Sequence, residues 1–263
     1  MTADSRIPSF SVVTVSLNAE RTIGDTIASV AAQDWPELEH IVIDGGSTDG
    51  TAKIVEAAAH GRLHFVSESD QGIYDAMNKG LALATGDYVG FLNADDFLAG
   101  PDSIRRLAAV AMRTGADCLL GDTQYVDSAG RPRGRLYSTF GFRPWWLRLG
   151  IQPPHPSFFA RTELLERAGG FDTRFRIGAD FDLIARLMLR HKGSWARAKG
   201  VIACFREGGL TTSRLAIKRE IGREAAASLR ALGQPFAGAA VQLRYPVKLL
   251  QLAAGAFQTR RKR

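Results

Sequence analysis

Two carboxylates and an amide directly follow an apolar segment, and side chains of these types can bind a metal ion. Residues 88–92 are apolar and β-prone, and Asn93, Asp95 and Asp96 come immediately after them. A buried strand would deliver these side chains to its carboxyl end, where open α/β sheets bind their ligands. Oxygen donors there predict a divalent metal and a phosphorylated ligand. Alternatively, Asp95 and Asp96 are turn residues ahead of the Gly-Pro break at 100–101.

A second polar cluster follows the apolar segment 40–43 and begins with Asp44. At a strand end, Asp44 could accept hydrogen bonds from a nucleobase or a ribose, and the two glycines after it allow a ligand to approach the backbone closely. The same stretch could form an ordinary loop between a strand and a helix, with Ser47 or Asp49 as the N-cap. Capping and binding are compatible here.

A third polar cluster runs from Glu68 through Asp70 to Gly80, after the apolar segment 63–67. Within it, Asp75 and Lys79 are spaced i, i+4 on a predicted helix, so Lys79 either serves a ligand or forms only a salt bridge. Three successive strand ends thus carry acidic or amide groups. Their convergence on one edge is hard to explain by coincidental capping.

The elements that must position these side chains alternate along the first 114 residues. We predict strands over 11–17, 40–43, 63–67 and 88–92, and helices over 22–33, 51–59, 73–84 and 101–114. Such alternation is typical of an α/β fold with a mostly parallel sheet flanked by helices. The first strand is not followed by Gly-x-Gly-x-x-Gly or by a Gly-Lys-Ser/Thr phosphate loop, which argues against dinucleotide oxidoreductases and P-loop NTPases.

The pattern is less regular in the second half. We predict short strands over 118–121 and 124–126, a turn over 130–135, and helices over 161–168, 180–191 and 216–232. Segment 139–156 contains two tryptophans and the run Pro-Pro-His-Pro, and it fits neither periodicity. It is either a flap on the acceptor side or a strand-and-helix insertion packed by its tryptophans.

Composition and charge indicate a soluble chain with a basic end. With 45% hydrophobic residues in 263, the chain can bury a full core, and it contains neither a signal-peptide pattern nor an apolar run of membrane-spanning length. We therefore expect a cytoplasmic location. The two cysteines, Cys118 and Cys204, lie in apolar surroundings without metal-ligand spacing, which predicts buried thiols.

The excess of positive charge belongs to the C-terminal region. Residues 214–263 hold eleven Lys and Arg against two Glu, or +9, which leaves −2 of the total +7 for the rest of the chain. A basic tail attracts anionic lipid headgroups or nucleic acid. Because aromatic residues are not interleaved with the charges and no nucleic-acid motif is present, we favour the membrane surface over nucleic acid. A merely solvated helical face is the alternative.

Taken together, four stretches resemble family 2 inverting glycosyltransferases with the GT-A fold, of the type that assembles bacterial exopolysaccharide or O-antigen. They are Ser-Val-Val-Thr-Val-Ser-Leu-Asn at 11–18, Ile-Asp-Gly-Gly-Ser-Thr-Asp-Gly-Thr at 43–51, Asp-Gln-Gly-Ile-Tyr-Asp-Ala-Met-Asn-Lys-Gly at 70–80, and Gly-Asp-Tyr-Val-Gly-Phe-Leu-Asn-Ala-Asp-Asp at 86–96. The resemblance covers residues 9–212. It implies a GT-A domain over 1–212, with a nucleotide-binding half over 9–100 and an acceptor half over 101–212, followed by a basic helical extension over 213–263.

The resemblance assigns roles to the three clusters. Asn93-Ala94-Asp95 resembles the family's Asp-x-Asp motif, so Asp95 is the expected ligand of Mg²⁺ or Mn²⁺, with Asn93 and Ala94 beside the nucleotide-diphospho-sugar donor. The residues expected to line the donor pocket are Ser16, Asn18, Asp44, Asp70 and Lys79. Many relatives carry a second acid after Asp44 that reads the base, but here Gly45 stands in its place, so the nucleobase is not predicted.

A later motif, Gly-Ala-Asp-Phe-Asp at 178–182, resembles the family's Glu-Asp pair near the acceptor, with Ala179 in place of Glu. Asp180 then corresponds to the catalytic base. The alternative is that Asp180 only caps the helix that follows, where an acid is stabilising in any case. Asp182 faces elsewhere on a helix and ranks lower.

Two further residues stay open at this point. His155 could contact the acceptor or the donor phosphate, or it could be structural. Arg206 could clamp the diphosphate, or it could pair with Glu207.

The resemblance implies a metal-dependent inverting transferase that moves one sugar to a glycan or polyprenyl-diphosphate-linked acceptor in surface polysaccharide biosynthesis. The Gln-x-x-Arg-Trp motif of processive synthases is absent, so a single sugar is expected. We expect the basic C-terminus to hold the enzyme on the inner face of the plasma membrane. The alternatives are a non-catalytic nucleotide-sugar or glycan-binding module and a sugar nucleotidyltransferase.

Overall fold

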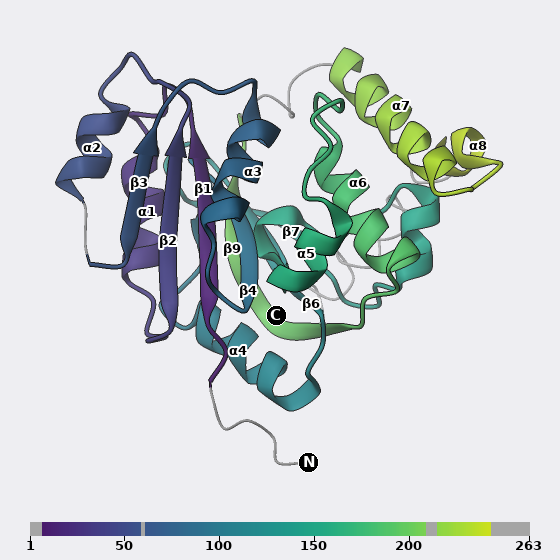
Figure 1. Cartoon of the computed structure of the whole chain (residues 1–263), viewed down its shortest axis with the longest axis horizontal. Helices are drawn as coiled ribbons and strands as arrows, with labels where there is room; N and C mark the ends of the chain where they lie inside the picture. Colours follow the sequence, from purple (N-terminus) through teal and green to yellow (C-terminus); the bar gives the residue numbers. More distant parts are fainter. Residues whose placement is uncertain (1–6, 59–60, 209–214, 243–263) are drawn as a thin grey trace.

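The computed structural model describes residues 7–58, 61–208 and 215–242 (Figure 1). Four parallel strands form one half of its sheet, in the order β3-β2-β1-β4. Their bounds are β1 Phe10–Ser16, β2 Leu38–Asp44, β3 Leu63–Ser67 and β4 Tyr88–Asn93. All seven residues of β1 are buried, as expected for a central strand covered on both faces. The four strands predicted in this region are confirmed.

Helices cover both faces of this half. Val13 and Val15 of β1 pack in one apolar cluster with α3 (Ile73–Leu83), whereas Val12 packs in another with α1 (Ile23–Ala31) and α4 (Ser103–Thr114). This alternation is the two-residue period of a strand buried on both sides. The remaining helix of this half, α2 (Thr51–Ala57), lies beside α1 at the left in Figure 1.

Beyond β4 the sheet is mixed. The strand β8 (Phe158–Arg161) lies antiparallel between β4 and β6 (Cys118–Val126), and β9 (Trp195–Arg206) runs parallel to β6 and antiparallel to the short β5 (Phe97–Leu98). A hairpin strand, β7 (Pro132–Tyr137), pairs with β6 where only a turn is predicted. The parallel arrangement expected from the sequence therefore holds for the first half, while the α/β fold class is confirmed.

Segment 139–156 is a packed insertion without a strand of its own. It forms a 3₁₀ turn, η1 (Pro144–Leu149), and enters a second, η2 (His155–Ser157). Phe142, Leu147 and Ile151 are buried, while Trp145 is 55% exposed. Aliphatic and phenyl groups, more than the two tryptophans, therefore anchor this segment.

The remaining helices lie at the right in Figure 1. They are α5 (Thr162–Ala168), α6 (Ala179–Ala185) with its π-helical continuation η3 (Arg186–Arg190), α7 (Leu215–Ala231) and α8 (Ala237–Gln242). α7 packs on α6 and α8 packs on η1, so helices within 215–242 share the main hydrophobic core with the rest of the fold. The basic residues 244, 248 and 260–263 lie outside the described residues.

No helix in the described ranges is long and apolar enough to cross a bilayer. Cys118 and Cys204 are buried, as predicted. Burial raises the pKa of the Cys118 thiol to about 12 and that of Cys204 to about 11, so both stay protonated near neutral pH.

Candidate active site

The carboxyl ends of the first four strands bring the predicted polar clusters to one edge, at the top of the sheet in Figure 1. In the strand register, Ser16 lies opposite Asp44, and Asp44 lies opposite Ser67. Val15 pairs with Asn93 of β4 on the other side. The convergence expected from three successive strand ends is present.

Asp44 is the hydrogen-bonding centre of this edge. Its Oδ1 accepts from the hydroxyls of Ser16 (3.2 Å) and Ser47 (2.5 Å), and its Oδ2 accepts from the Ser47 amide (2.9 Å) and the Ser67 hydroxyl (2.8 Å). Burial by itself would raise the pKa of Asp44, but these hydrogen bonds outweigh burial and hold the pKa below its ordinary value. The side chain is fully buried, so in this structure Asp44 shapes the loop; its contact with a base stays a prediction.

Asn18 joins the first and second loops. Its backbone adopts a φ of 53°, in the left-handed region that asparagine tolerates. The backbone N–H of Asn18 donates to the Ser47 hydroxyl (2.7 Å), and the side-chain Oδ1 of Asn18 accepts from the backbone N–H of Thr48 (2.9 Å). The two loops expected to line the donor pocket are therefore a single hydrogen-bonded unit.

Asp70 occupies the space that a side chain at Gly45 would need. A Cβ at position 45 would lie 2.3 Å from Oδ2 of Asp70. The other carboxylate oxygen, Oδ1, accepts from the Gly72 amide (2.8 Å). The carboxylate of Asp70, from the third cluster, thus lies directly beside the backbone of the residue that follows Asp44.

Lys79 holds the loop between β3 and α3. Its ammonium group donates to the Ser69 carbonyl (2.9 Å) and lies 2.8 Å from Glu68 and 3.7 Å from Asp75. The hydrogen bond with Glu68 raises the pKa of Lys79, while partial desolvation opposes the shift. The predicted salt bridge with Asp75 is present, and a contact with the donor stays a prediction.

The two acids after β4 have different surroundings. Asp96 is fully buried, with Oδ1 accepting from the Arg206 amide (3.1 Å). Burial, together with the charge of Asp95, raises the pKa of Asp96 well above its usual value. Burial also raises the pKa of Asp95, whose side chain keeps partial access to solvent. Of the two acids, Asp95 is therefore the one presented to a ligand, while Ala94 between Asn93 and Asp95 is buried.

Arg206 braces the loop that carries Asp95. Its guanidinium donates through Nε to the Asp95 carbonyl (3.1 Å), through Nη2 to Asp25 (2.7 Å) and through Nη1 to the Ser128 carbonyl (2.5 Å). The side chain pairs with Asp25 and not with Glu207. All three guanidinium nitrogens are occupied, so the structure favours a bracing role over a diphosphate clamp.

A chain of polar side chains connects the donor edge to Asp180. The amide Nδ2 of Asn93 lies 3.3 Å from Nε2 of His155, and Nδ1 of His155 lies 3.8 Å from Oδ2 of Asp180. Because Asn93 donates, Nε2 of His155 accepts and Nδ1 carries the proton that faces Asp180. Burial lowers the pKa of His155, although the charges of Asp180 and Asp95 oppose the shift, so the ring is neutral at pH 7.

Sequence reasoning did not identify Gln152, the second partner of Asp180. Its Nε2 donates to Oδ2 of Asp180 at 2.7 Å, and its backbone carbonyl accepts from Tyr137 (2.7 Å). The only signal in the sequence was the rigid Pro-Pro-His-Pro run that follows it. The insertion thus supplies two side chains to one oxygen of Asp180, whose side chain remains 22% exposed.

Asp182 lies outside this arrangement, as its lower rank predicted. Its carboxylate forms a buried ion pair with Nε of Arg186 at 2.7 Å. Arg186 also donates to the carbonyls of Ala168 and Gly170. This pair ties α6 to the end of α5 and contributes to the fold.

The residues around Asp95 fit a hard divalent cation whose other ligands would be oxygens of a bound phosphate and water. Within the described ranges, no three His, Cys, Asp or Glu side chains could hold a metal by themselves. Mg²⁺ and Mn²⁺ sites of this kind need only one or two carboxylates, with phosphate oxygens and water completing the shell. Oδ1 of Asn93 is buried without a hydrogen-bond partner, a second oxygen beside Asp95.

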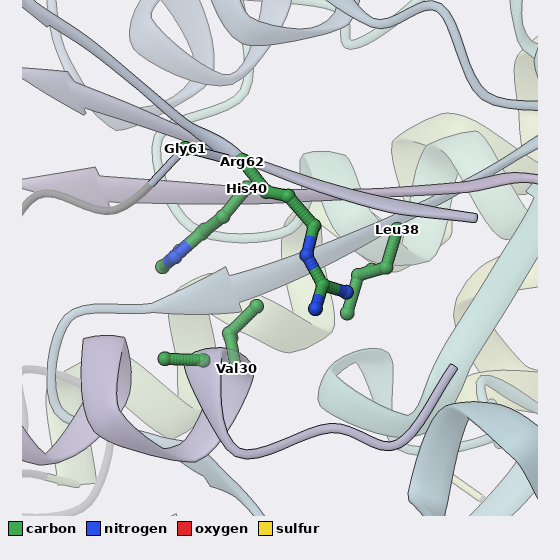
Figure 2. A pocket seen from close by; sticks show the side chains of 6 residues that line it. Val30, Leu38, His40, Gly61 and Arg62 are labelled. Carbon is green, nitrogen blue, oxygen red and sulfur yellow. The ribbon is translucent and has the colours of Figure 1, made fainter. Parts of the chain in front are cut away.

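A cavity of about 300 Å³ lies elsewhere, between α1 and the beginnings of β2 and β3 (Figure 2). It is lined by Val30, Ala31, Leu38, His40, Gly61 and Arg62. None of the predicted site residues borders it. Because Leu38 and Asp44 are at opposite ends of β2, this cavity is far from the carboxyl edge.

Comparison with known proteins decides the family. The family described as Glycosyl transferase family 2 matches residues 11–179. This chain belongs to glycosyl transferase family 2. An uncharacterized glycosyltransferase of Mycobacterium tuberculosis is 35% identical over 183 residues, which cover 69% of this chain and 70% of that protein. A PGL/p-HBAD biosynthesis glycosyltransferase of Mycobacterium bovis is 32% identical over 211 residues, covering 78% and 80%.

Solved structures confirm the GT-A fold of this family 2 chain. Staphylococcus aureus TarS 1–349 in complex with UDP-GlcNAc superposes with a TM-score of 0.67 at 21% identity, covering 84% of this chain and just under two thirds, 66%, of the TarS chain. The Pyrobaculum calidifontis mannosyltransferase in complex with GDP-Man and Mn²⁺ gives a TM-score of 0.61 at 21% identity, covering 97% and 81%.

Proposed function

We propose that this family 2 glycosyltransferase is metal-dependent and inverting, and that it transfers one sugar from a nucleotide-diphospho-sugar to an acceptor hydroxyl. The observation that carries the proposal is the path Asn93–His155–Asp180. It connects the strand end expected to bind the diphosphate with a partly exposed carboxylate on the acceptor side. A transferase needs these two functions next to each other.

On the donor side, Asp95 would hold Mg²⁺ or Mn²⁺ together with the diphosphate oxygens. The ion would neutralise the charge that develops on the diphosphate as it leaves. Ser16, Asn18, Asp70 and their hydrogen-bonded loops would bind the nucleoside. Complexes of structural neighbours with UDP-GlcNAc and with GDP-Man and Mn²⁺ support a donor of this class.

On the acceptor side, Asp180 would act as the base. The acceptor hydroxyl loses its proton to Asp180 while its oxygen forms a bond to the anomeric carbon, and the bond from that carbon to the phosphate oxygen breaks. Attack from the face opposite the diphosphate inverts the anomeric configuration. General base catalysis of this kind contributes about 10²–10⁴ in rate. Gln152 donates to Oδ2, and Nδ1 of His155 lies 3.8 Å from the same oxygen, which leaves Oδ1 for the hydroxyl.

The acceptor class follows from charge and from the relatives. One relative is named for PGL/p-HBAD biosynthesis, which supports a surface glycan or glycolipid acceptor. We infer a glycan or polyprenyl-diphosphate-linked acceptor, with the basic C-terminus holding the enzyme on the inner face of the plasma membrane. Each basic residue near an anionic surface contributes about 1 kcal/mol, so the anchor would be reversible.

A donor panel tests this proposal. Purified protein is mixed with UDP-, GDP- and dTDP-sugars and Mn²⁺ or Mg²⁺, and release of the nucleoside diphosphate is measured. We expect metal-dependent release from one donor that is lost in Asp95→Ala and retained in Asp34→Ala, whose carboxylate pairs with Arg105 away from this edge. Tight nucleotide binding without turnover across a wide acceptor panel would instead favour a non-catalytic binding module, and release of pyrophosphate from a nucleoside triphosphate and a sugar phosphate would favour a nucleotidyltransferase.

A further inference from the structure

The turn that leads into α6 is held by buried side chains from two other helices. Glu224 of α7 accepts three consecutive backbone N–H groups: Oε1 accepts from Arg176 (2.8 Å), and Oε2 accepts from Ile177 (3.0 Å) and Gly178 (2.6 Å). Tyr74 of α3 donates its hydroxyl to the carbonyl of Ile177. Side chains of α3 and α7 thus bind three backbone N–H groups and one backbone carbonyl of the same turn.

Both side chains that hold this turn are buried in the fold. Glu224 is 9% exposed and Tyr74 is 8% exposed, so each side chain is placed by packing. A Cβ at position 178 would lie 3.1 Å from Oε2 of Glu224, so a side chain there would crowd this carboxylate. A carboxylate that accepts several N–H groups forms charge-assisted hydrogen bonds, roughly twice as strong as neutral ones. Burial and the negative charge of Asp180 raise the pKa of Tyr74, so its hydroxyl stays a donor.

The turn 176–178 ends two residues before Asp180. Asp180 itself lies in the first turn of α6. The helix that bears Tyr74 makes a second connection here, because Asn78 exchanges two hydrogen bonds with the backbone of Phe171 (2.9 and 2.8 Å). Tyr74 and Asn78 both belong to the third polar cluster, residues 68–80. That cluster therefore joins the donor half to the segment that presents the base.

We propose that Tyr74 and Glu224 are positioning residues that clamp the turn 176–178 and so set the Asp180 carboxylate against the donor. This inference rests on the proposed function. It makes α7 a part of the active-site architecture, although α7 lies beyond residues 11–179, which match the family. A base displaced by about 1 Å can cost on the order of 10²-fold in rate, so partial loosening has a measurable effect.

Two near-isosteric variants test the clamp. In Glu224→Gln, an NH₂ group replaces an oxygen that accepts N–H groups, so two donors face each other. Tyr74→Phe removes only the hydroxyl. The matched controls are Glu220→Gln, an ion-pairing residue one turn earlier on α7, and Tyr88→Phe, which loses a buried hydroxyl bonded to the Ala116 carbonyl.

We expect kcat for transfer to fall about tenfold or more in each clamp variant, while KM for the donor changes less than twofold and both controls keep wild-type kcat. Wild-type kcat in Glu224→Gln and Tyr74→Phe would overturn the proposal. So would equal losses in the clamp variants and their controls, because these would indicate general destabilisation.

Amide hydrogen exchange tests the clamp without any measurement of turnover. The amides of residues 176–178 should exchange at least tenfold faster in Glu224→Gln than in wild type, while those of β1 stay protected. Unchanged exchange at 176–178 would contradict the clamp. A wild type that transfers no sugar would count against the proposed function, and the exchange rates would still decide whether Glu224 holds the turn.

Discussion

Asp44 and Asp180 are carboxylates on the same side of the sheet, and their hydrogen bonds suit them to different tasks. Asp44 accepts four hydrogen bonds and is fully buried. Asp180 accepts one hydrogen bond, from Gln152, and keeps an exposed fraction of 22%. A carboxylate with all its oxygens occupied fixes a loop, whereas one with a free oxygen can take a proton from a ligand.

Replacing Asp44 by Asn should destabilise the protein, because the amide brings donors to a place where three serines donate. We expect a loss of about 2 kcal/mol in the free energy of unfolding at pH 7. The pKa of Asp44 lies below its ordinary value of 3.8, so its contribution is present above that pH and is lost as the pH falls through the lowered pKa. Denaturant titrations of wild type and Asp44→Asn from pH 7 to pH 2.5 measure the difference. A difference that widens in acid would contradict this account.

Gln152→Ala should weaken catalysis and spare donor binding. It removes a hydrogen bond to a charged oxygen of Asp180, and such bonds contribute about 1.5–3 kcal/mol. We expect kcat to fall roughly tenfold, with an unchanged dissociation constant for the nucleotide by calorimetry. Gln124→Ala is a control, since Gln124 only bonds backbone carbonyls at the β6–β7 hairpin. Equal kcat in wild type and Gln152→Ala would show that Gln152 does not contribute to catalysis.

At the level of elements, the close approach of α3 to β1 depends on Gly80. A Cβ at this position would lie 2.3 Å from the side chain of Val13. Asp70, which precedes α3, and Asn78, in the middle of α3, keep their places only if the helix lies flat on the sheet. Packing at one small residue thus supports both the donor loop and the segment before α6.

Gly80→Ala should therefore destabilise the fold by about 1–3 kcal/mol through overpacking. The matched control is Gly24→Ala in α1, where the nearest atom to a new Cβ is 3.8 Å away. We expect that control to be neutral or to stabilise by up to about 1 kcal/mol, because alanine favours helix. Thermal unfolding of the two variants compares them directly, and equal melting temperatures would show that the contact at Gly80 relaxes at no cost.

The elements differ in how far the sequence predicted them. β1–β4 and α1–α4 follow clear periodic patterns, so they were predicted to within a few residues. β8 has only four residues, and β9 carries Arg197 and Lys199 among its apolar residues, so neither produced a pattern. Asn93, Asp95 and Asp180 were predicted from motifs, but Gln152 and Glu224 act through loop and helix contacts that no local pattern encodes.

At the scale of the whole molecule, side chains connect the first hundred residues with the part of the chain that follows them. Asn93 reaches His155, Tyr74 reaches Ile177 and Arg206 reaches Asp25. The helices α7 and α8 pack into the main hydrophobic core. The residues after 242 carry six Lys and Arg without an acid, and none of the predicted site residues lies among them.

Removing residues 243–263 should abolish binding to anionic vesicles and leave turnover with a water-soluble acceptor unchanged. Six basic residues contribute about 1 kcal/mol each to binding an anionic surface, and a neutral surface offers no such attraction. Co-sedimentation with vesicles of anionic and of neutral lipid, at low and high salt, measures this. Equal binding of the full and shortened chains to anionic vesicles would place the contact elsewhere.

We propose above that Asp180 takes the proton from the acceptor in this family 2 transferase. The most direct measurement is the single-turnover rate of sugar transfer, with the donor named by the panel, in wild type, Asp180→Asn and Asp172→Asn. Asp172 lies in the same segment, and its carboxylate is bound by Arg174. We predict a fall of about 10²–10⁴ for Asp180→Asn with donor affinity retained, and a wild-type rate for Asp172→Asn. Transfer by Asp180→Asn at the wild-type rate would contradict the account.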